Sequence, residues 1–155
     1  MSAELEQIAR RLVGAWTTEA THPAFPGTIV TGTAEVQLLE GERFLIFRSR
    51  TDHPDFPDSI SIIGETGGFQ WHYFDSRGVH RIYEFRVTDD GWEITRDAAG
   101  SDVPETGREA PPFSQRLTFT FEDDDKTMEG RSQISHDDET WQDDLQITYR
   151  RVHGS

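Results

Sequence analysis

The sequence predicts an all-β fold, a closed antiparallel up-and-down β-barrel of about ten strands with a short N-terminal helix. Apolar and polar residues alternate in most segments after residue 14, and short polar turns separate these segments. Aromatic residues make up 11% of the chain, with 4 Trp and 10 Phe, although only 34% of the residues are hydrophobic. A few large side chains must therefore supply the core, which is typical of small barrels. Closure of the sheet removes the free edges that would invite aggregation.

The N-terminal segment has the pattern of an amphipathic helix. Ser2 suits the N-cap position, and Gly14 is expected to end the helix. Between them, apolar residues follow the spacing i, i+3, i+4, i+7, at Leu5, Ile8, Ala9 and Leu12. One face of this helix should pack against the barrel.

Ten segments then carry strand signals. The expected strands are 15–21, 29–39, 43–51, 58–65, 69–75, 79–87, 91–97, 113–121, 127–135 and 140–151. Every second connection is short or polar and should lie at one tight end of the barrel. The other connections should meet at the opposite end, the mouth, and they are 22–28, 52–57, 76–78, 98–112 and 136–139. The connection 98–112 is rich in Gly, Pro and charged residues, so we expect a mobile lid or a disordered loop there.

The string His-Pro-x-Phe-Pro occurs twice, at residues 22–26 and 53–57. Two prolines in five residues forbid a central strand, so both copies must be loops. Both copies fall in connections at the mouth. We therefore expect His22, Phe25, His53 and Phe56 to form part of its rim.

Alternation along the strands predicts which side chains face the barrel interior. Apolar residues should fill the half near the tight end, and polar residues should line the half near the mouth, which is the usual anatomy of a small-molecule site. In the third strand the two faces are not distinguished by the pattern. The expected ligand-binding residues are Arg50, Trp71, Tyr73, Asp75, Arg81, Tyr83, Arg96, Gln115, Trp141 and Asp143.

The charged members of this set allow two interpretations. An inward Arg81 must meet a carboxylate or an anionic ligand, and Asp75 and Asp143 are the internal candidates for a partner. In one interpretation these charges bind a ligand. In the other they pair with each other and serve only the structure.

Acid–base chemistry is an alternative use of the same pocket. His22 or His53 could work with Asp75 or Asp143 as a general acid–base pair, which would suit a cofactor-independent isomerase or cyclase. Binding alone is the simpler hypothesis. The histidines of the loops follow no known metal-binding spacing, so we expect neither a metal nor a cofactor.

Composition limits the partners. The formal net charge is −14, which disfavours nucleic acid and anionic membranes. The chain has no cysteine, which excludes disulfides and thiolate chemistry. The N-terminal residues have no apolar signal segment, so we expect a cytoplasmic protein. We expect one domain over residues 1–155, as a monomer or a homodimer.

Some stretches resemble known families. Gly14-Ala15-Trp16 resembles the Gly-x-Trp signature of the lipocalins and the wider calycin superfamily. Longer stretches resemble a group of uncharacterised calycin-like bacterial proteins, at residues 12–33, 43–64, 72–83 and 140–151.

The first strands and the closing run Leu145-x-x-x-Tyr149-Arg150-Arg151 also resemble nitrobindins, which are ten-stranded barrels that hold haem. In that family a histidine of the last strand binds the iron. Here residues 140–151 contain no histidine, and Asp144 lies about where it would be expected. The resemblance implies a barrel with a cavity, and the missing ligand counts against haem.

The sequence thus favours a barrel that binds a small, partly apolar ligand with a polar or anionic group. A cofactor-independent enzyme and a haem-binding, nitrobindin-like protein are the alternatives.

Overall fold

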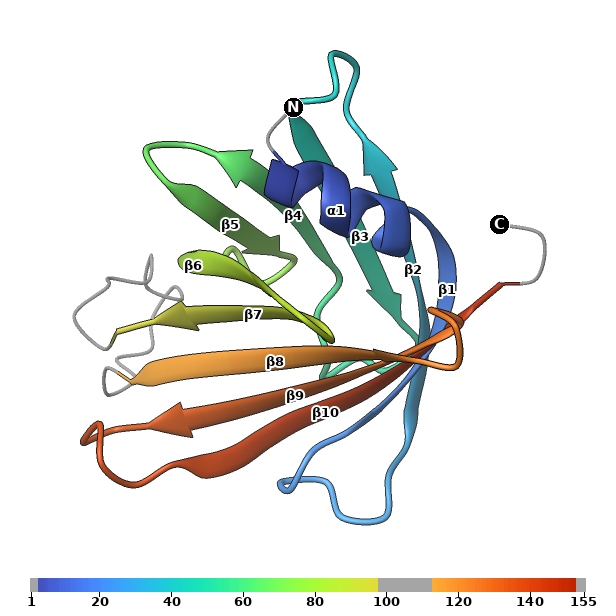
Figure 1. Cartoon of the computed structure of the whole chain (residues 1–155). Helices are drawn as coiled ribbons and strands as arrows, with labels where there is room; N and C mark the ends of the chain where they lie inside the picture. Colours follow the sequence, from blue (N-terminus) through green and yellow to red (C-terminus); the bar gives the residue numbers. More distant parts are fainter. Residues whose placement is uncertain (1–2, 98–112, 153–155) are drawn as a thin grey trace.

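Ten antiparallel strands close into a barrel that carries one N-terminal helix (Figure 1). The structure is a computed structural model that describes residues 3–97 and 113–152. The elements are α1 (Ala3–Leu12), β1 (Gly14–Thr21), β2 (Val30–Leu38), β3 (Phe44–Thr51), β4 (Ser59–Glu65), β5 (Phe69–Asp75), β6 (His80–Thr88), β7 (Gly91–Arg96), β8 (Ser114–Glu122), β9 (Thr127–Ser135) and β10 (Gln142–Arg151). The predicted fold class is therefore confirmed. The loop 98–112 lies outside the described residues.

Each strand pairs with its neighbours in the sequence, and β1 pairs with β10 to close the barrel. The described connections after β1, β3, β5 and β9 lie at one end, which is the mouth. The chain enters β1 and leaves β10 at the opposite, closed end, because the sheet is an antiparallel meander.

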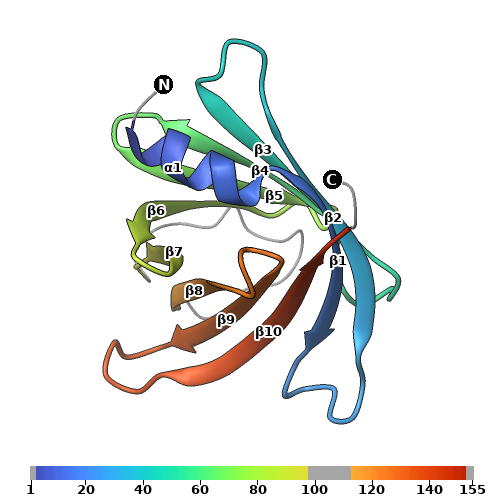
Figure 2. The ribbon, with the colours of Figure 1, turned by 45° about the vertical axis from the view of Figure 1, so that its right-hand side comes forward.

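Helix α1 lies beside β3 and β4 in both views of the ribbon (Figures 1 and 2). The four residues of its apolar stripe, Leu5, Ile8, Ala9 and Leu12, are all buried in the core of the barrel. The indole nitrogen of Trp16 donates a hydrogen bond of 3.0 Å to the carbonyl oxygen of Leu12. This bond uses one of the carbonyl groups that the end of a helix leaves without a partner.

Two arginines fasten the helix to the closed end. Arg11 forms a bidentate ion pair with Asp125 in the β8–β9 turn, at 2.9 and 3.1 Å. Arg151 at the end of β10 donates to the carbonyl oxygens of Arg11 and Val13. Each guanidinium also covers an aromatic ring, Arg11 that of Phe121 and Arg151 that of Trp16. Bidentate, stacked arginines hold a fixed geometry better than lysines would.

A stack of aromatic rings fills the barrel interior and belongs to the same core as the apolar side chains of α1. The ring of Trp92 lies on Phe119 with centroids 3.6 Å apart, and on its other side it stacks with Trp71 at 4.8 Å. Gly130 on β9 leaves the space for this stack, since a Cβ atom there would come within 2.7 Å of the Phe119 ring. The interior near the closed end is thus a filled, apolar floor, as the sequence predicted.

No helix in residues 3–97 and 113–152 is both long enough and apolar enough to cross a membrane.

The packing of α1 leads to a stability prediction. Leu12 is 0% exposed, so Leu12→Ala should leave a cavity and lower the free energy of unfolding by about 2–5 kcal/mol. Leu39→Ala is the matched control, because Leu39 lies in the β2–β3 turn and is 43% exposed. Urea unfolding of both variants measures the difference. Equal losses in the two variants would show that α1 is not part of the core.

Candidate functional site

The two His-Pro-x-Phe-Pro copies adopt the same local structure. In each copy the ring atom Nδ1 of the histidine accepts a hydrogen bond from the backbone N–H two residues later, at 3.0 Å for His22 and 3.1 Å for His53. In each copy the N–H of the phenylalanine donates to the histidine carbonyl oxygen, at 3.0 and 3.1 Å. The repeat is therefore a turn in which the histidine side chain satisfies the backbone.

The two turns meet at the mouth. The ring of Phe25 lies 5.6 Å from that of Phe56 and 5.9 Å from that of His53, measured between centroids. His22 also contacts Phe25, at 6.2 Å. The prediction that His22 and His53 share one end of the barrel is confirmed.

The interior surface agrees with most of the predicted set. The members that lie on the inward face of their strands are Trp71, Tyr73, Asp75, Arg81, Tyr83, Arg96 and Gln115. Trp71 belongs to the aromatic floor, and the others lie closer to the mouth.

Three predicted lining residues face outward instead. Arg50 is exposed, because Leu45 and Phe47 supply the buried face of β3. Asp143 accepts a hydrogen bond from Gln133 on the outer surface. Trp141 also lies outside, where its ring is covered by the guanidinium of Arg116 at 4.1 Å.

A β-bulge explains the errors in β10. The strand register shifts between Asp143 and Gln146, where β10 has one more residue than β9. An extra residue reverses the alternation of side chains. Asp143 therefore turns outward and Asp144 turns toward the barrel, and no feature of the sequence marks this position.

Asp144 connects the mouth to the interior. Its atom Oδ1 lies 2.6 Å from Nε2 of His22, and its atom Oδ2 accepts a hydrogen bond of 3.0 Å from the hydroxyl of Ser132. Because Nδ1 of His22 already accepts a bond from Ala24, the ring proton is on Nε2 and is donated to the carboxylate. His22 thus holds the first turn of the mouth against β10.

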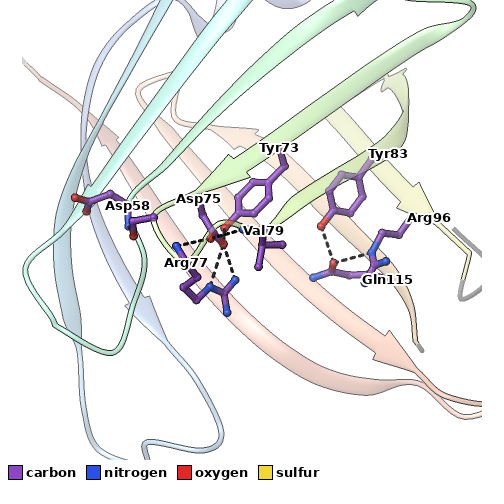
Figure 3. A network of polar contacts seen from close by, with 9 residues as sticks. Asp58, Tyr73, Asp75, Arg77, Val79, Tyr83, Arg96 and Gln115 are labelled. Carbon is purple, nitrogen blue, oxygen red and sulfur yellow. Dashed lines mark hydrogen bonds and ion pairs between the residues drawn. The ribbon is translucent and has the colours of Figure 1, made fainter. Parts of the chain in front are cut away.

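The network continues across the barrel. Gln115 donates from Nε2 to Ser132 at 3.1 Å, and its Oε1 accepts from the hydroxyl of Tyr83 at 2.7 Å. Arg96 also points its Nε at Oε1 of Gln115, at 3.5 Å. Figure 3 shows Tyr83, Gln115 and Arg96 converging inside the barrel. These hydrogen bonds link buried polar side chains of β6, β7, β8 and β9 across the barrel.

Two guanidinium groups lie at the same height. Arg81 and Arg96 are 5.4 and 4.4 Å from the centroid of the Phe113 ring. Arg81 shares its face of β6 with Tyr83 and Phe85, which are both buried. Its predicted inward orientation is confirmed. Its predicted partners are not, because Asp143 faces outward and Asp75 is bound to Arg77.

Asp75 forms a separate cluster at the mouth (Figure 3). Its carboxylate is 0% exposed, and it accepts bonds from Arg77 at 2.6 Å and from the hydroxyl of Tyr73 at 2.7 Å. Burial raises the pKa of Asp75, but the bonds from Arg77 and Tyr73 outweigh burial and lower this pKa below its ordinary value. Burial and the bond to Asp75 raise the pKa of Tyr73.

A cleft of about 490 Å³ opens at the side of the mouth. It lies between residues 21–29 on one side and residues 131–132 and 143–146 on the other. Phe25, Ile29 and Leu145 give it apolar walls, and the His22–Asp144 pair is part of its lining. This volume falls in the range of small-molecule pockets.

Among the described residues, the donor groups around His22 and Asp144 are engaged with one another. The described residues contain no group of three or more His, Cys, Asp or Glu side chains that could hold a metal ion. Asp144, at the position expected for a haem ligand, is already bonded by His22 and Ser132 through its two oxygens. The imidazole of His22 likewise has both nitrogens engaged.

Comparisons with known proteins agree with this architecture. A family model described as "Protein of unknown function (DUF1579)" matches residues 4–151. The crystal structure of Rv2717c from M. tuberculosis superposes with a TM-score of 0.71, covering 99% of each chain at 16% sequence identity. That likeness shows the fold. No curated protein matches the chain.

The cluster around Asp75 leads to a pH prediction. A lowered pKa in the folded state means that the carboxylate stabilises the fold above its unfolded-state pKa of about 3.9 and loses this effect as the pH falls further. Asp75→Asn should therefore lower the free energy of unfolding by about 1–3 kcal/mol at neutral pH. The difference from wild type should shrink in acid, below about pH 4.

Urea unfolding at several pH values measures this difference. Asp89→Asn, in the exposed β6–β7 turn, is the control and should match wild type throughout. A constant difference between wild type and Asp75→Asn at all pH values would contradict the assignment.

Proposed function

The chain belongs to the DUF1579 family, and we propose that it binds a small, partly apolar ligand with an anionic group in the mouth half of its barrel. The observation that carries this proposal is the division of the interior. An aromatic floor closes one half, and two inward arginines with several hydrogen-bonding side chains occupy the other. An apolar surface with a few convergent polar groups is the usual composition of a ligand site.

The arginines set the expected charge of the ligand. Arg81 and Arg96 place two cations on adjacent strands, against the same aromatic ring. Guanidinium groups bind carboxylates and sulfonates through charge-assisted hydrogen bonds, which are stronger than bonds between neutral groups. An anionic group would lie there, and the apolar part of the ligand would rest on the floor.

The cleft beside β10 supplies a route of access. Its polar side ends at Asp144 and Ser132, and Ser132 is in turn bonded to Gln115 in the interior. The ligand would pass the apolar walls formed by Phe25, Ile29 and Leu145. Resemblance to lipocalins and nitrobindins, which enclose ligands in barrels, supports the same use of the interior.

The side chains favour binding over catalysis. Ser132 donates to Asp144 and not to His22, so the three residues do not form a nucleophile and its base. Both ring nitrogens of His22 are engaged, Nδ1 by the N–H of Ala24 and Nε2 by Asp144, so the ring serves to hold the turn.

A fluorescent probe of the proposed chemistry tests the site. Anilinonaphthalene sulfonate carries aromatic rings and one anionic group, and it should bind wild type with a rise in emission. Arg81→Met should weaken binding about tenfold or more, because the loss of a hydrogen bond to a charged group costs about 1.5–3 kcal/mol. Fluorescence titration measures the dissociation constants.

Arg86→Met is the matched control for this variant. Arg86 lies on the same strand but on the outer face, with its side chain 71% exposed. The Arg86→Met variant should bind the probe with the same dissociation constant as wild type. Phenylnaphthylamine, which lacks the sulfonate, should show no difference between wild type and Arg81→Met. Equal losses in both variants, or an equal effect on both probes, would contradict the proposed role of Arg81.

A further inference from the structure

The outer face of β3, β4, β5 and β6 carries two cross-strand rows of mainly apolar side chains. The first row is Arg48, Ile60, Phe74 and His80, and the second row is Ile46, Ile62, His72 and Ile82. We call these eight residues the outer patch. It lies on the opposite face of the sheet from the ligand site proposed above.

The outer patch is unusual for this molecule. Phe74 is 40% exposed and Ile82 is 45% exposed, and His80 stacks on Phe74 with ring centroids 4.5 Å apart. Neither row contains a carboxylate, although the chain has 29 acidic residues and a net charge of −14. Ile46, Ile60 and Ile62 beside them are half-buried, and a contiguous apolar surface of this kind marks an interaction surface.

We propose that the outer patch joins two copies of this chain into a two-fold symmetric dimer. A partner with the same net charge of −14 would be repelled elsewhere on this acidic surface. The rows free of carboxylates are the place where two copies meet with the least repulsion. A two-fold interface must also be complementary to itself, and the charges at the corners of the outer patch meet this requirement.

Two opposite charges lie at opposite corners. Arg48 ends the first row on β3, and Glu84 follows Ile82 on β6, just beyond the second row. Both are exposed, and neither forms an ion pair within the described part of the chain. Glu84 accepts one hydrogen bond of 3.2 Å from the neutral amide of Gln70, which leaves its negative charge, like the positive charge of Arg48, available for a second copy.

The geometry of a two-fold axis brings these corners together. Three strand spacings separate Arg48 from Glu84 across the sheet, about 14 Å, and four residues separate them along a strand, about 13 Å. A two-fold axis in the plane of the patch, at right angles to this diagonal, places Arg48 of each copy opposite Glu84 of the other. The strands of the two sheets then cross at nearly a right angle, which is one of the two common packings of sheets.

Sedimentation velocity on the purified chain tests the proposal. The measurements are made at protein concentrations of about 10 and about 200 µM, because these two values bracket the dissociation constant expected of a modest interface. Wild type should reach twice the monomer mass of 17.7 kDa at the higher concentration. Ile82→Asp should stay monomeric, because it buries a carboxylate among apolar side chains. Ile29→Asp changes an isoleucine that is 62% exposed on a mouth loop, and it should dimerise as wild type does.

A charge exchange tests the arrangement without disturbing the apolar side chains. Arg48→Glu and Glu84→Arg should each raise the dimer dissociation constant on the order of tenfold, and the double variant should restore most of the affinity. Arg10→Glu on the exposed face of α1 is the control for charge reversal. Thermal melts establish that every variant is folded.

A wild type that remains monomeric at the higher concentration would overturn the proposal. A dimer that Ile82→Asp leaves intact would overturn it as well. A double variant no tighter than the single ones would overturn the two-fold arrangement of Arg48 and Glu84. None of these measurements depends on ligand binding, so the proposed dimer and the proposed ligand site are tested independently.

Discussion

Pairing between β1 and β10 is the constraint on which the rest of this structure depends. It runs from Trp16 opposite Arg151 to Thr21 opposite Gln146, and it converts a meander into a barrel with a defined interior. Closure forces each strand to place alternate side chains inside. Beyond Gln146 the pairing stops, β10 bulges, and the first mouth loop moves away from it. The cleft lies at this point because the backbone ladder between β1 and β10 ends there. The His22–Asp144 contact replaces the missing backbone bonds with one bond between side chains.

Most of the fold could be predicted from the sequence, because strand alternation and turn residues are local signals. The rim could also be predicted, since the prolines of the two repeats exclude strands and the meander places alternate loops at one end. The errors at Trp141 and Asp143 come from a single extra residue in β10, which depends on pairing with β9 and leaves no local mark. Arg50 was misplaced for a different reason. Each face of β3 has two apolar residues followed by two polar ones, and only the neighbouring strands decide which face is buried.

Stability and the proposed site use different parts of the barrel. Helix α1 and the aromatic stack around Trp92 fill the closed end. The ion pair of Arg11 with Asp125 and the hydrogen bonds from Arg151 hold the helix in place. These contacts bury the largest apolar side chains, so they supply most of the hydrophobic free energy of the fold. The half of the interior near the mouth therefore does not have to supply this hydrophobic free energy. It can keep polar side chains such as Gln115 and Ser132 inside, where they add less to stability but define the chemistry of the interior.

Strand β6 shows how closely the two proposed surfaces are related. Arg81 and Tyr83 face the interior, whereas His80 and Ile82, their neighbours in the chain, face the outer patch. Side chains on opposite faces of a strand do not touch each other, so a substitution at Ile82 changes the outer surface without removing a contact inside. The backbone is shared, however, and a partner packed on β5 and β6 would restrict the motion of both strands. The polarity of the two faces follows the same logic. The polar side chains inside the barrel hydrogen-bond to one another. The apolar side chains of the outer patch are not covered by any other segment in the described part of the chain, and this is the physical reason to expect a second molecule there.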